Sequence, residues 1–275
     1  MRSSKFFFVF GAVLTAVALI GLYGCSDDKA TTTVQEDPQY VTVQEQTNSY
    51  IDSTMILAAN ALQTVLVANA GSDTSVPVDY GSVRPDTIIT DGGWYVVILD
   101  DLATAYEFHY RDSIQFRKGT VPQAHPRGAD EMSIRHAWSF NTADTTGAFR
   151  NYDVRGAYEF GGLNTDQATV NGTSNFQAEA RRTFGGLNIR STYVLESTVS
   201  DVVFNRAQQG WQYGCPVSGT VTATATLTFH GDAPAQDVVT TWNIEVTFAN
   251  GVMNASATSD NATRTYTRTL CQNGN

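Results

Sequence analysis

Apolar and polar side chains alternate along most of this chain from residue 94 onward. In one typical stretch, Tyr106, Phe108 and Tyr110 occupy one phase of the alternation, while Glu107 and His109 occupy the other. Successive side chains of a β-strand point to opposite faces, so this pattern predicts strands with one buried and one wet face. Sheets with such strands are antiparallel. We therefore predict an antiparallel meander over residues 94–270.

A helix is predicted over residues 49–70, which contain no Gly or Pro and are rich in Ala and Leu. Ile51, Met55 and Leu62 fall on one side of it, and Gly71 ends it. The stretch is almost uncharged, which predicts a helix packed on more than one side.

Turn signals predict the order of the strands. The pentapeptide FGGLN occurs at residues 160–164 and again at 184–188, with Asn171-Gly172 between the two copies. Gly-Gly and Asn-Gly are both hairpin signals. We predict a turn at each of the three places, so that both copies of FGGLN lie at the same end of the sheet. Residues 72–93, which include two prolines, are predicted to be a loop.

The predicted sheet is too large for its helix to cover when flat. About ten strands have an apolar face, so we predict a sheet that curls into a barrel or a strongly bent half-barrel with the helix on its concave side. The domain is therefore mainly β, a large curved antiparallel up-and-down sheet with one N-terminal helix, over residues 49–275.

In topology this arrangement resembles the bacterial periplasmic lipoprotein carriers of the LolA/LolB type, which combine one helix with a large curved antiparallel sheet. The resemblance favours an apolar cavity with an aromatic lining. The candidate lining residues are Tyr106, Phe108, Trp138, Phe140, Tyr158 and Trp242. Two alternatives are that these rings simply fill the core, and that the strands form a membrane-spanning barrel.

The first residues have the three parts of an export signal. A short positive region is followed by residues 6–24, which carry no charge, and by Cys25. Leu22, Gly24 and Cys25 resemble the bacterial lipobox, from which Tyr23 departs by its size. The resemblance implies that a lipoprotein signal peptide, residues 1–24, is removed and that Cys25 carries diacylglycerol and a further acyl chain such as palmitate. Two or three acyl chains would anchor the chain stably in a membrane.

Residues 25–48 are predicted to be the lipidated cysteine and a flexible tether, because few of them are large and apolar. In the lipoproteins of enteric bacteria, an Asp directly after the lipidated cysteine is a retention signal. This chain has Ser26 at that position, so the resemblance favours the outer membrane. Alternatives are an ordinary signal peptide cut near Gly24 and an uncleaved amino-terminal helix. All three hypotheses place the remaining chain outside the cytoplasm, in the periplasm or at the cell surface.

Charge and cysteine content narrow the classes of partner. Removing the signal leaves 15 basic and 27 acidic side chains, a net charge of −12. This argues against nucleic acid as a partner, because phosphate binding needs a basic face. Cys215 and Cys271 alone follow Cys25, and in an exported protein such a pair predicts a disulfide. Its contribution to stability would be about 4 kcal/mol on the loop-entropy model.

Motifs that carry chemistry are missing, so no catalytic residue, metal ligand or cofactor is predicted. His136 falls on an apolar face, where a hydrogen-bonded core histidine is the favoured interpretation over a base or ligand. Asp100-Asp101 is interpreted as part of a solvated turn. The alternatives are that the pair takes part in acid chemistry or binds calcium. The threonines at 220–228 and 263–269 are interpreted as the wet side of the sheet rather than as a binding surface.

The predicted function is that of a membrane-anchored extracytoplasmic lipoprotein with a non-enzymatic binding or envelope-structure role. Its partners would be the membrane, through the lipid anchor, and either an apolar small molecule or an envelope protein. One alternative is a carrier of an apolar ligand in the curled sheet. A second is a hydrolase whose catalytic residues are dispersed along the sequence.

Overall fold

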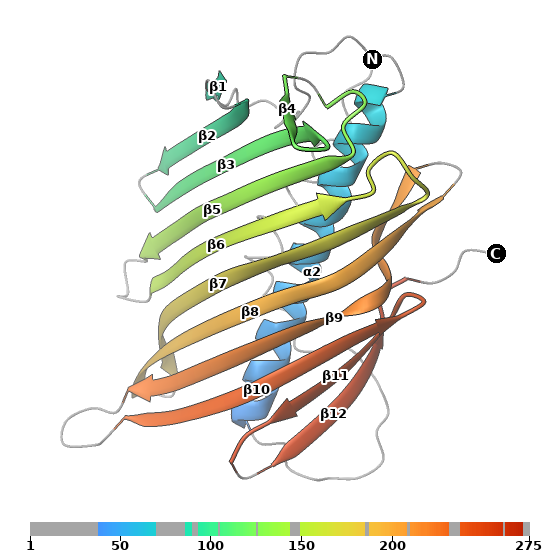
Figure 1. The fold of residues 1–275 in the computed structure, drawn as a ribbon. Helices are drawn as coiled ribbons and strands as arrows, with labels where there is room; N and C mark the ends of the chain where they lie inside the picture. The colour runs from blue at the N-terminus through green and yellow to red at the C-terminus, as the bar shows by residue number, and fades with distance from the viewer. Residues whose placement is uncertain are drawn as a thin grey trace, which may run out of the picture.

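The computed structural model describes residues 38–69, 86–89, 93–103, 105–124, 126–143, 149–184, 187–207, 210–230, 237–260 and 262–271. The predicted signal peptide and Cys25 lie outside the described residues. The described part contains the helix α2 (Pro38–Asn69) and twelve strands (Figure 1). The strands are β1 (Asp86–Ile89), β2 (Trp94–Ala103), β3 (Tyr106–Lys118), β4 (Val121–Gln123), β5 (Glu131–Ala143), β6 (Phe149–Gly161), β7 (Gln167–Phe184), β8 (Leu187–Ala207), β9 (Gly210–His230), β10 (Val238–Ala249), β11 (Val252–Thr258) and β12 (Thr263–Thr269).

All twelve strands belong to one sheet in which every pairing is antiparallel. The order is β1-β2-β3-β5-β6-β7-β8-β9-β10-β11-β12, and β4 pairs with β3 alone. Strands are therefore neighbours in space in the order in which the chain makes them. β1 and β12 form the two edges, so the sheet does not close into a barrel. The predicted fold class, a large curved up-and-down antiparallel sheet with one helix, is confirmed.

The sheet curls around α2, which crosses one of its faces diagonally (Figure 1). The hydroxyl of Tyr50 in α2 is hydrogen-bonded to Ser197 of β8. On the far side, Tyr266 of β12 donates to Asn48 Oδ1 at 3.1 Å. Because β8 and β12 are separated by three other strands, one helix can contact both only if the sheet bends around it.

The core lies between α2 and the inward face of the sheet, which is the face that α2 covers. Ile51, Met55 and Leu62 of the helix are at most 2% exposed. Burying a side chain of this size contributes about 1.5–3 kcal/mol. Within residues 40–59, only Glu45 and Ser53 are exposed, so the helix is enclosed on nearly all sides, as its uncharged sequence predicts. Nowhere in the described chain does a helix combine the length and the apolar character that crossing a membrane requires.

The structure places the start of the helix at Pro38, eleven residues before the predicted start at residue 49. Proline suits the first turn of a helix, where its missing N–H costs nothing. Tyr40, Val43 and Thr47 are buried one helical turn apart, and they continue the buried stripe that includes Tyr50. Polar neighbours on both sides of Val43 and of Thr47 hide this stripe in the sequence.

The predicted hairpin at Asn171-Gly172 is also wrong. β7 runs without interruption from Gln167 to Phe184, and its register with β8 shifts at this point. Asn171 uses its side chain to accept a hydrogen bond from the backbone N–H of Asp201 at 2.7 Å, which supports a β-bulge. The two copies of FGGLN therefore mark opposite ends of one strand. Within the predicted loop at 72–93, β1 adds a further strand.

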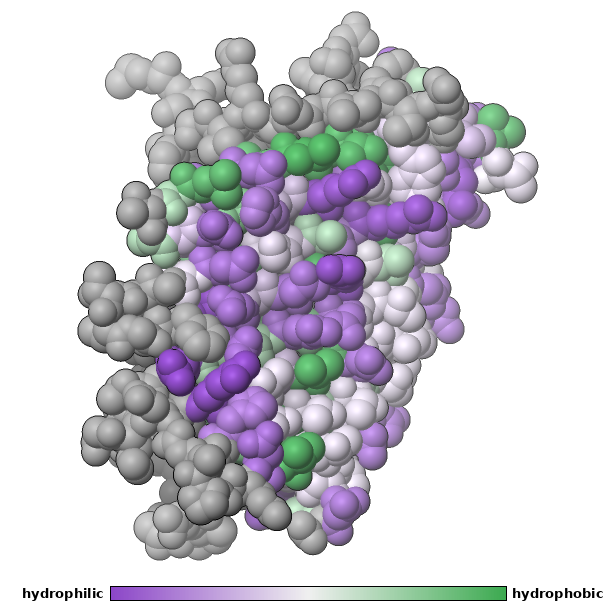
Figure 2. All heavy atoms as spheres, turned by 90° about the vertical axis from the view of Figure 1, so that its left-hand side faces the viewer, coloured by the Kyte–Doolittle hydropathy of each residue, from purple (hydrophilic) through white to green (hydrophobic). Residues whose placement is uncertain are grey.

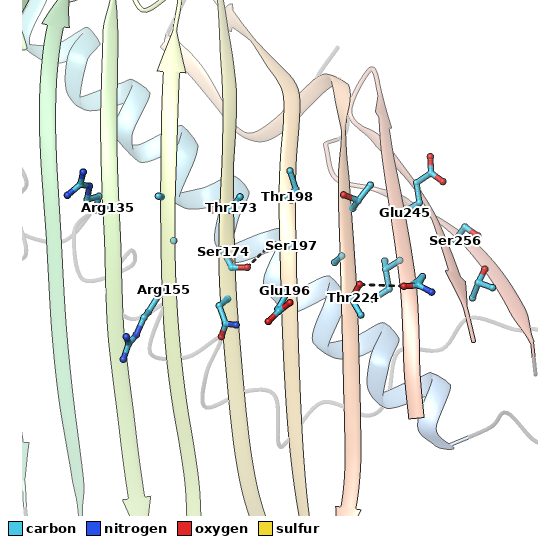
Figure 3. Close-up of a pocket in the computed structure, with 18 residues that line it drawn as sticks. Arg135, Arg155, Thr173, Ser174, Glu196, Ser197, Thr198, Thr224, Glu245 and Ser256 are labelled. Atoms are coloured by element: carbon cyan, nitrogen blue, oxygen red, sulfur yellow. Dashed lines mark hydrogen bonds between the residues drawn. The ribbon is translucent and has the colours of Figure 1, made fainter. Parts of the chain in front are cut away.

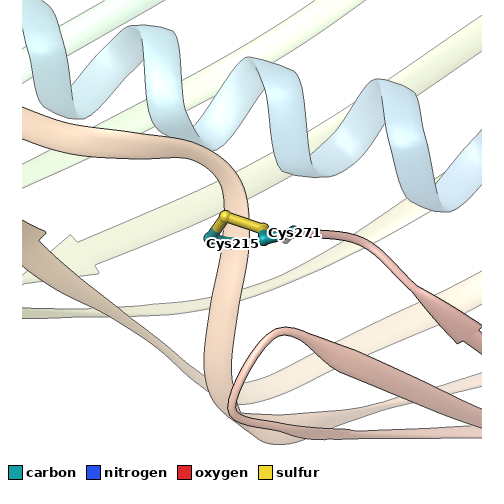
Figure 4. Close-up of a disulfide and its surroundings, with 2 residues drawn as sticks. All are labelled: Cys215 and Cys271. Atoms are coloured by element: carbon teal, nitrogen blue, oxygen red, sulfur yellow. A yellow bond between two sulfur atoms is a disulfide. The ribbon is translucent and has the colours of Figure 1, made fainter. Parts of the chain in front are cut away.

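The predicted disulfide joins Cys215 of β9 to Cys271, which follows β12, with their Cα atoms 5.6 Å apart (Figure 4). The curl of the sheet and a bend in β9 bring the two residues together. At the bend, Gly219 has φ +110°, and a Cβ there would lie 2.4 Å from the Cα of Val202. The β10–β11 turn fits beside the disulfide, since Gly251 donates to the Pro216 carbonyl at 3.0 Å. Val202, Cys215, Gly251 and Cys271 belong to four different segments of the chain, which thus lie close together.

Candidate functional site

Aromatic rings line up across five strands on the inward face. The ring centroids lie 5.8 Å apart for Tyr106 and Phe140, 6.4 Å for Phe140 and Tyr152, 6.2 Å for Tyr152 and Phe176, and 6.0 Å for Phe176 and Tyr193. These distances fall in the range in which aromatic pairs attract each other. Two further rings, Phe108 and Trp138, join the same group at 6.4 Å from each other. We call these residues the aromatic row: Tyr106, Phe108, Trp138, Phe140, Tyr152, Phe176 and Tyr193.

Part of the aromatic row is not enclosed by the core. Tyr106, Trp138, Phe140 and Phe176 remain partly exposed. α2 packs mainly against β9, and the left-hand ends of β3, β5 and β6 extend beyond it in Figure 1. Figure 2 shows the molecule from that side, with hydrophilic side chains over much of the coloured surface and hydrophobic ones in small groups. The row thus runs from buried rings to partly exposed rings on the inward face.

A buried polar cluster borders the aromatic row. Among the described residues Asp112 carries the one buried carboxylate, which is 5% exposed. His136 donates from Nδ1 to Asp112 Oδ1 at 2.5 Å, and the Tyr110 hydroxyl donates to Oδ2 at 2.5 Å. A buried charge is costly unless it is hydrogen-bonded, and here both oxygens are. His136 is therefore a hydrogen-bonded histidine at the border of the core, as its place on an apolar face predicts.

The sheet register continues this cluster into hydroxyl groups under α2. His136, Gly156, Ser174 and Ser197 follow one another across β5 to β8. Gly156 leaves space for the ring of Tyr158, because a Cβ there would lie 2.6 Å from that ring. Burial raises the pKa of Tyr158 well above its ordinary value of 10. The pKa of Tyr193 in the aromatic row is raised for the same reason.

The six residues predicted to line a cavity lie in three places. Tyr106, Phe108, Trp138 and Phe140 belong to the aromatic row, where the structure brings them together. Tyr158 lies under α2, next to the hydroxyl groups. Trp242 is 1% exposed and packs against Tyr40 near the start of α2, with ring centroids 5.8 Å apart. The alternation identified each of them as inward-facing but carried no information on their grouping.

The outward face of the sheet, opposite α2, carries an open hollow of about 1010 Å³ (Figure 3). Thr173, Thr198 and Thr222 are consecutive cross-strand neighbours in its floor. Arg155 and Glu196 supply opposite charges to its lining. A second outward hollow, of about 580 Å³, includes Thr265 and Thr267 of β12. The threonine rows therefore lie on the wet side, as interpreted from the sequence.

The acidic pair at the end of β2 is divided between the two faces of the sheet. Asp100 accepts a hydrogen bond from His109 Nδ1 at 2.7 Å, and Asp101 accepts one from the Tyr106 hydroxyl at 2.7 Å. Both carboxylates are exposed, and each is satisfied across the β2–β3 hairpin. The described residues contain no group of three or more His, Cys, Asp or Glu side chains that could hold a metal ion.

Sequence reasoning missed one set of side chains. His230 is hydrogen-bonded through Nε2 to Thr192 Oγ1 at 2.8 Å and through Nδ1 to Asp237 Oδ2 at 3.0 Å. Thr192 is 38 positions from the histidine, so no local motif marks the group. The sheet register alone brings it together. No protein-family model matches this chain, and neither a curated protein nor a solved structure shows significant similarity to it.

Proposed function

We propose that this chain is an exported lipoprotein, anchored in the outer membrane through Cys25, whose β-domain binds an apolar molecule or an apolar segment of an envelope protein. The aromatic row is the observation that carries the binding role. Its partly exposed rings offer an apolar surface, and the Tyr110–Asp112–His136 cluster borders that surface with polar groups. Apolar surfaces with a few fixed polar groups are typical of ligand sites.

The architecture supports this proposal over a purely structural role in the envelope. A sheet that served only as a scaffold would place its large inward rings under the helix. Here Trp138 and Phe140 of β5 remain partly exposed, and the left-hand end of β5 extends beyond α2 in Figure 1. The likeness to LolA/LolB-type carriers rests on topology alone, and it agrees with an apolar ligand on the curved sheet.

The binding role is tested with the fluorescent apolar probe N-phenyl-1-naphthylamine and the full chain in mild detergent. We expect saturable binding that Trp138→Ala weakens by at least ten-fold, because the ring forms part of the surface. Trp94→Ala is the matched control, since Trp94 lies on the outward face, where its ring contacts Arg135. Equal binding by the two variants, or no saturable binding by the folded protein, would contradict the proposal.

The anchor is tested separately by growing cells with a palmitate analogue. The wild-type chain should be labelled and found in the outer-membrane fraction, because a free Cys25 thiol is needed to form the thioether. Cys25→Ser should lose the label and the membrane association. Equal labelling of both chains would remove the lipoprotein from the proposal and leave the binding role standing.

A further inference from the structure

We propose that Thr192, His230 and Asp237 form a nucleophilic site that cleaves esters with a short apolar acyl group. This activity goes beyond the binding role of the aromatic row and lies on the opposite face of the sheet. The alternation of β8 places Thr192 on the outward face of the sheet, and the alternation of β9 places His230 on the same face. The site is recognised by geometry, as hydroxyl–imidazole–carboxylate sites are, and not by sequence order.

The hydrogen bonds determine where the protons are. A carboxylate can only accept, so the Nδ1 atom of His230 must carry the proton that is shared with Asp237. In the neutral imidazole Nε2 is then an acceptor, and the hydroxyl of Thr192 must donate to it. This is the arrangement in which an imidazole removes a proton from a hydroxyl and makes it a nucleophile.

Two strand ladders hold the three groups in place. Thr192 pairs with Thr228, two residues before His230, so Thr192 and His230 are diagonal neighbours across β8 and β9. Phe229 pairs with Val238, which places Asp237 beside His230 at the start of β10. Thr192 and His230 are carried by paired strands, which position side chains more precisely than loops do, and Asp237 directly precedes β10.

The surroundings of the site indicate the class of substrate. The side chain of His230 is 29% exposed and that of Asp237 is 49% exposed, so a dissolved ester can reach them. Val239 is 60% exposed and pairs with Thr228 in the same cross-strand row as Thr192, which gives an acyl chain an apolar contact. Arg190 pairs with His230 in the sheet register, and its Nε donates to Glu179 Oε1 at 2.6 Å.

The reaction proceeds in two balanced steps. Thr192 Oγ1 forms a bond to the ester carbonyl carbon while its proton moves to His230 Nε2. The tetrahedral intermediate then releases the alcohol, which takes that proton, and an acyl-threonine remains. Water attacks the acyl carbon, His230 takes its proton and returns it to Thr192 Oγ1, and the acid leaves.

A fluorophosphonate probe tests the site in the full detergent-solubilised chain, with intact mass and peptide mapping as the readout. We expect one phosphonyl group on Thr192, at least a ten-fold loss of labelling in Asp237→Asn, and complete loss in Thr192→Ala. Thr192→Ser should label faster, because a primary hydroxyl is less hindered. Thr198→Ala is the control, since Thr198 is an outward threonine of β8 with no imidazole partner among the described residues.

Hydrolysis of p-nitrophenyl butyrate separates catalysis from a structural role. Residues that act as a unit are not additive, so Thr192→Ala, His230→Gln and the double variant should fall to the same rate within about two-fold. Thr198→Ala should leave this rate unchanged, because Thr198 lies on the same outward face of β8 and contributes no group to the site. Labelling of Thr192→Ala as strong as that of the wild type, or no labelling of a chain whose circular dichroism shows it folded, would overturn the proposal.

Discussion

At the scale of single residues, small side chains decide where the large ones can lie. The ring of Tyr158 occupies space that Gly156 and Gly172 leave open. A Cβ at either position would lie 2.6 Å from the ring, and a Cβ at Gly172 would also lie 2.4 Å from the backbone oxygen of Ala157. The alternation of β6 predicts that Tyr158 faces inward, but not that its ring lies against both Gly156 of the same strand and Gly172 of β7. That direction depends on two glycines on different strands.

Gly156→Ala should lower the free energy of unfolding by roughly 1–3 kcal/mol, because the new methyl group collides with the Tyr158 ring and the core is already filled. Gly161→Ala is the matched control on the same strand, since a Cβ there meets nothing within 4 Å. Urea denaturation of both variants measures the difference. Equal stability would mean that the ring moves aside at no cost.

Buried tyrosines should make the fold sensitive to alkali. The pKa values of Tyr158 and Tyr193 are raised above 10 by burial, so both stay protonated in the folded state when the unfolded chain already ionises. The contribution of these tyrosines to the free energy of unfolding is therefore fully present below pH 10. It is lost as the pH rises further, by up to about 1.4 kcal/mol per pH unit for each tyrosine. Urea denaturation at pH 9, 10 and 11 should show a shallower loss for Tyr158→Phe/Tyr193→Phe. A loss as steep as in the wild type would exclude these two residues as the cause.

At the scale of elements, the sequence predicts the strands well and the limits of the helix poorly. Strand alternation depends on neighbouring positions, so β3, β5, β6 and β10 are visible in short windows. The first third of α2 buries one residue per turn between Gln and Thr side chains, and nothing in that window separates it from a tether. Asn171-Gly172 has the residues of a turn, yet the ladders on both sides keep β7 continuous.

The early start of α2 can be tested at Val43, which is 1% exposed. Val43→Ala should lower the free energy of unfolding by roughly 2 kcal/mol, because it removes buried methyl groups and leaves a cavity. Glu45→Ala, two positions further on at an exposed site, should change it by less than about 0.5 kcal/mol. Two equally small effects in thermal unfolding would return residues 38–48 to the tether.

At the scale of the whole molecule, the curl of the sheet is maintained at its last strand. β12 forms an edge, and its contacts with α2 come from Tyr266 and Arg268, which donates to Asp52 at 2.8 Å. The disulfide ties the end of this strand to β9. The same long-range organisation explains why the candidate sites escape sequence reasoning. The histidine partners of Asp112 and of Thr192 lie 24 and 38 positions away, and only the register identifies them.

Reduction of the disulfide should loosen this edge before the rest of the sheet. In hydrogen exchange on the full chain, the amides of β11 and β12 should exchange at least ten-fold faster after reduction. Those of β5 and β6, distant from the disulfide, should keep their rates. Uniform acceleration throughout the sheet would show that the disulfide stabilises the domain globally and not the curl.

The start of α2 at Pro38 also limits how far the protein can work from a membrane. If Cys25 carries the lipid, residues 26–37 are all that connect it to the folded domain. A chain of this length reaches at most about 45 Å when fully extended. The lower end of α2 in Figure 1 would then stay close to the lipid surface. A molecule that binds the aromatic row or Thr192 would then have to diffuse to the membrane surface, because the short connection keeps the domain there.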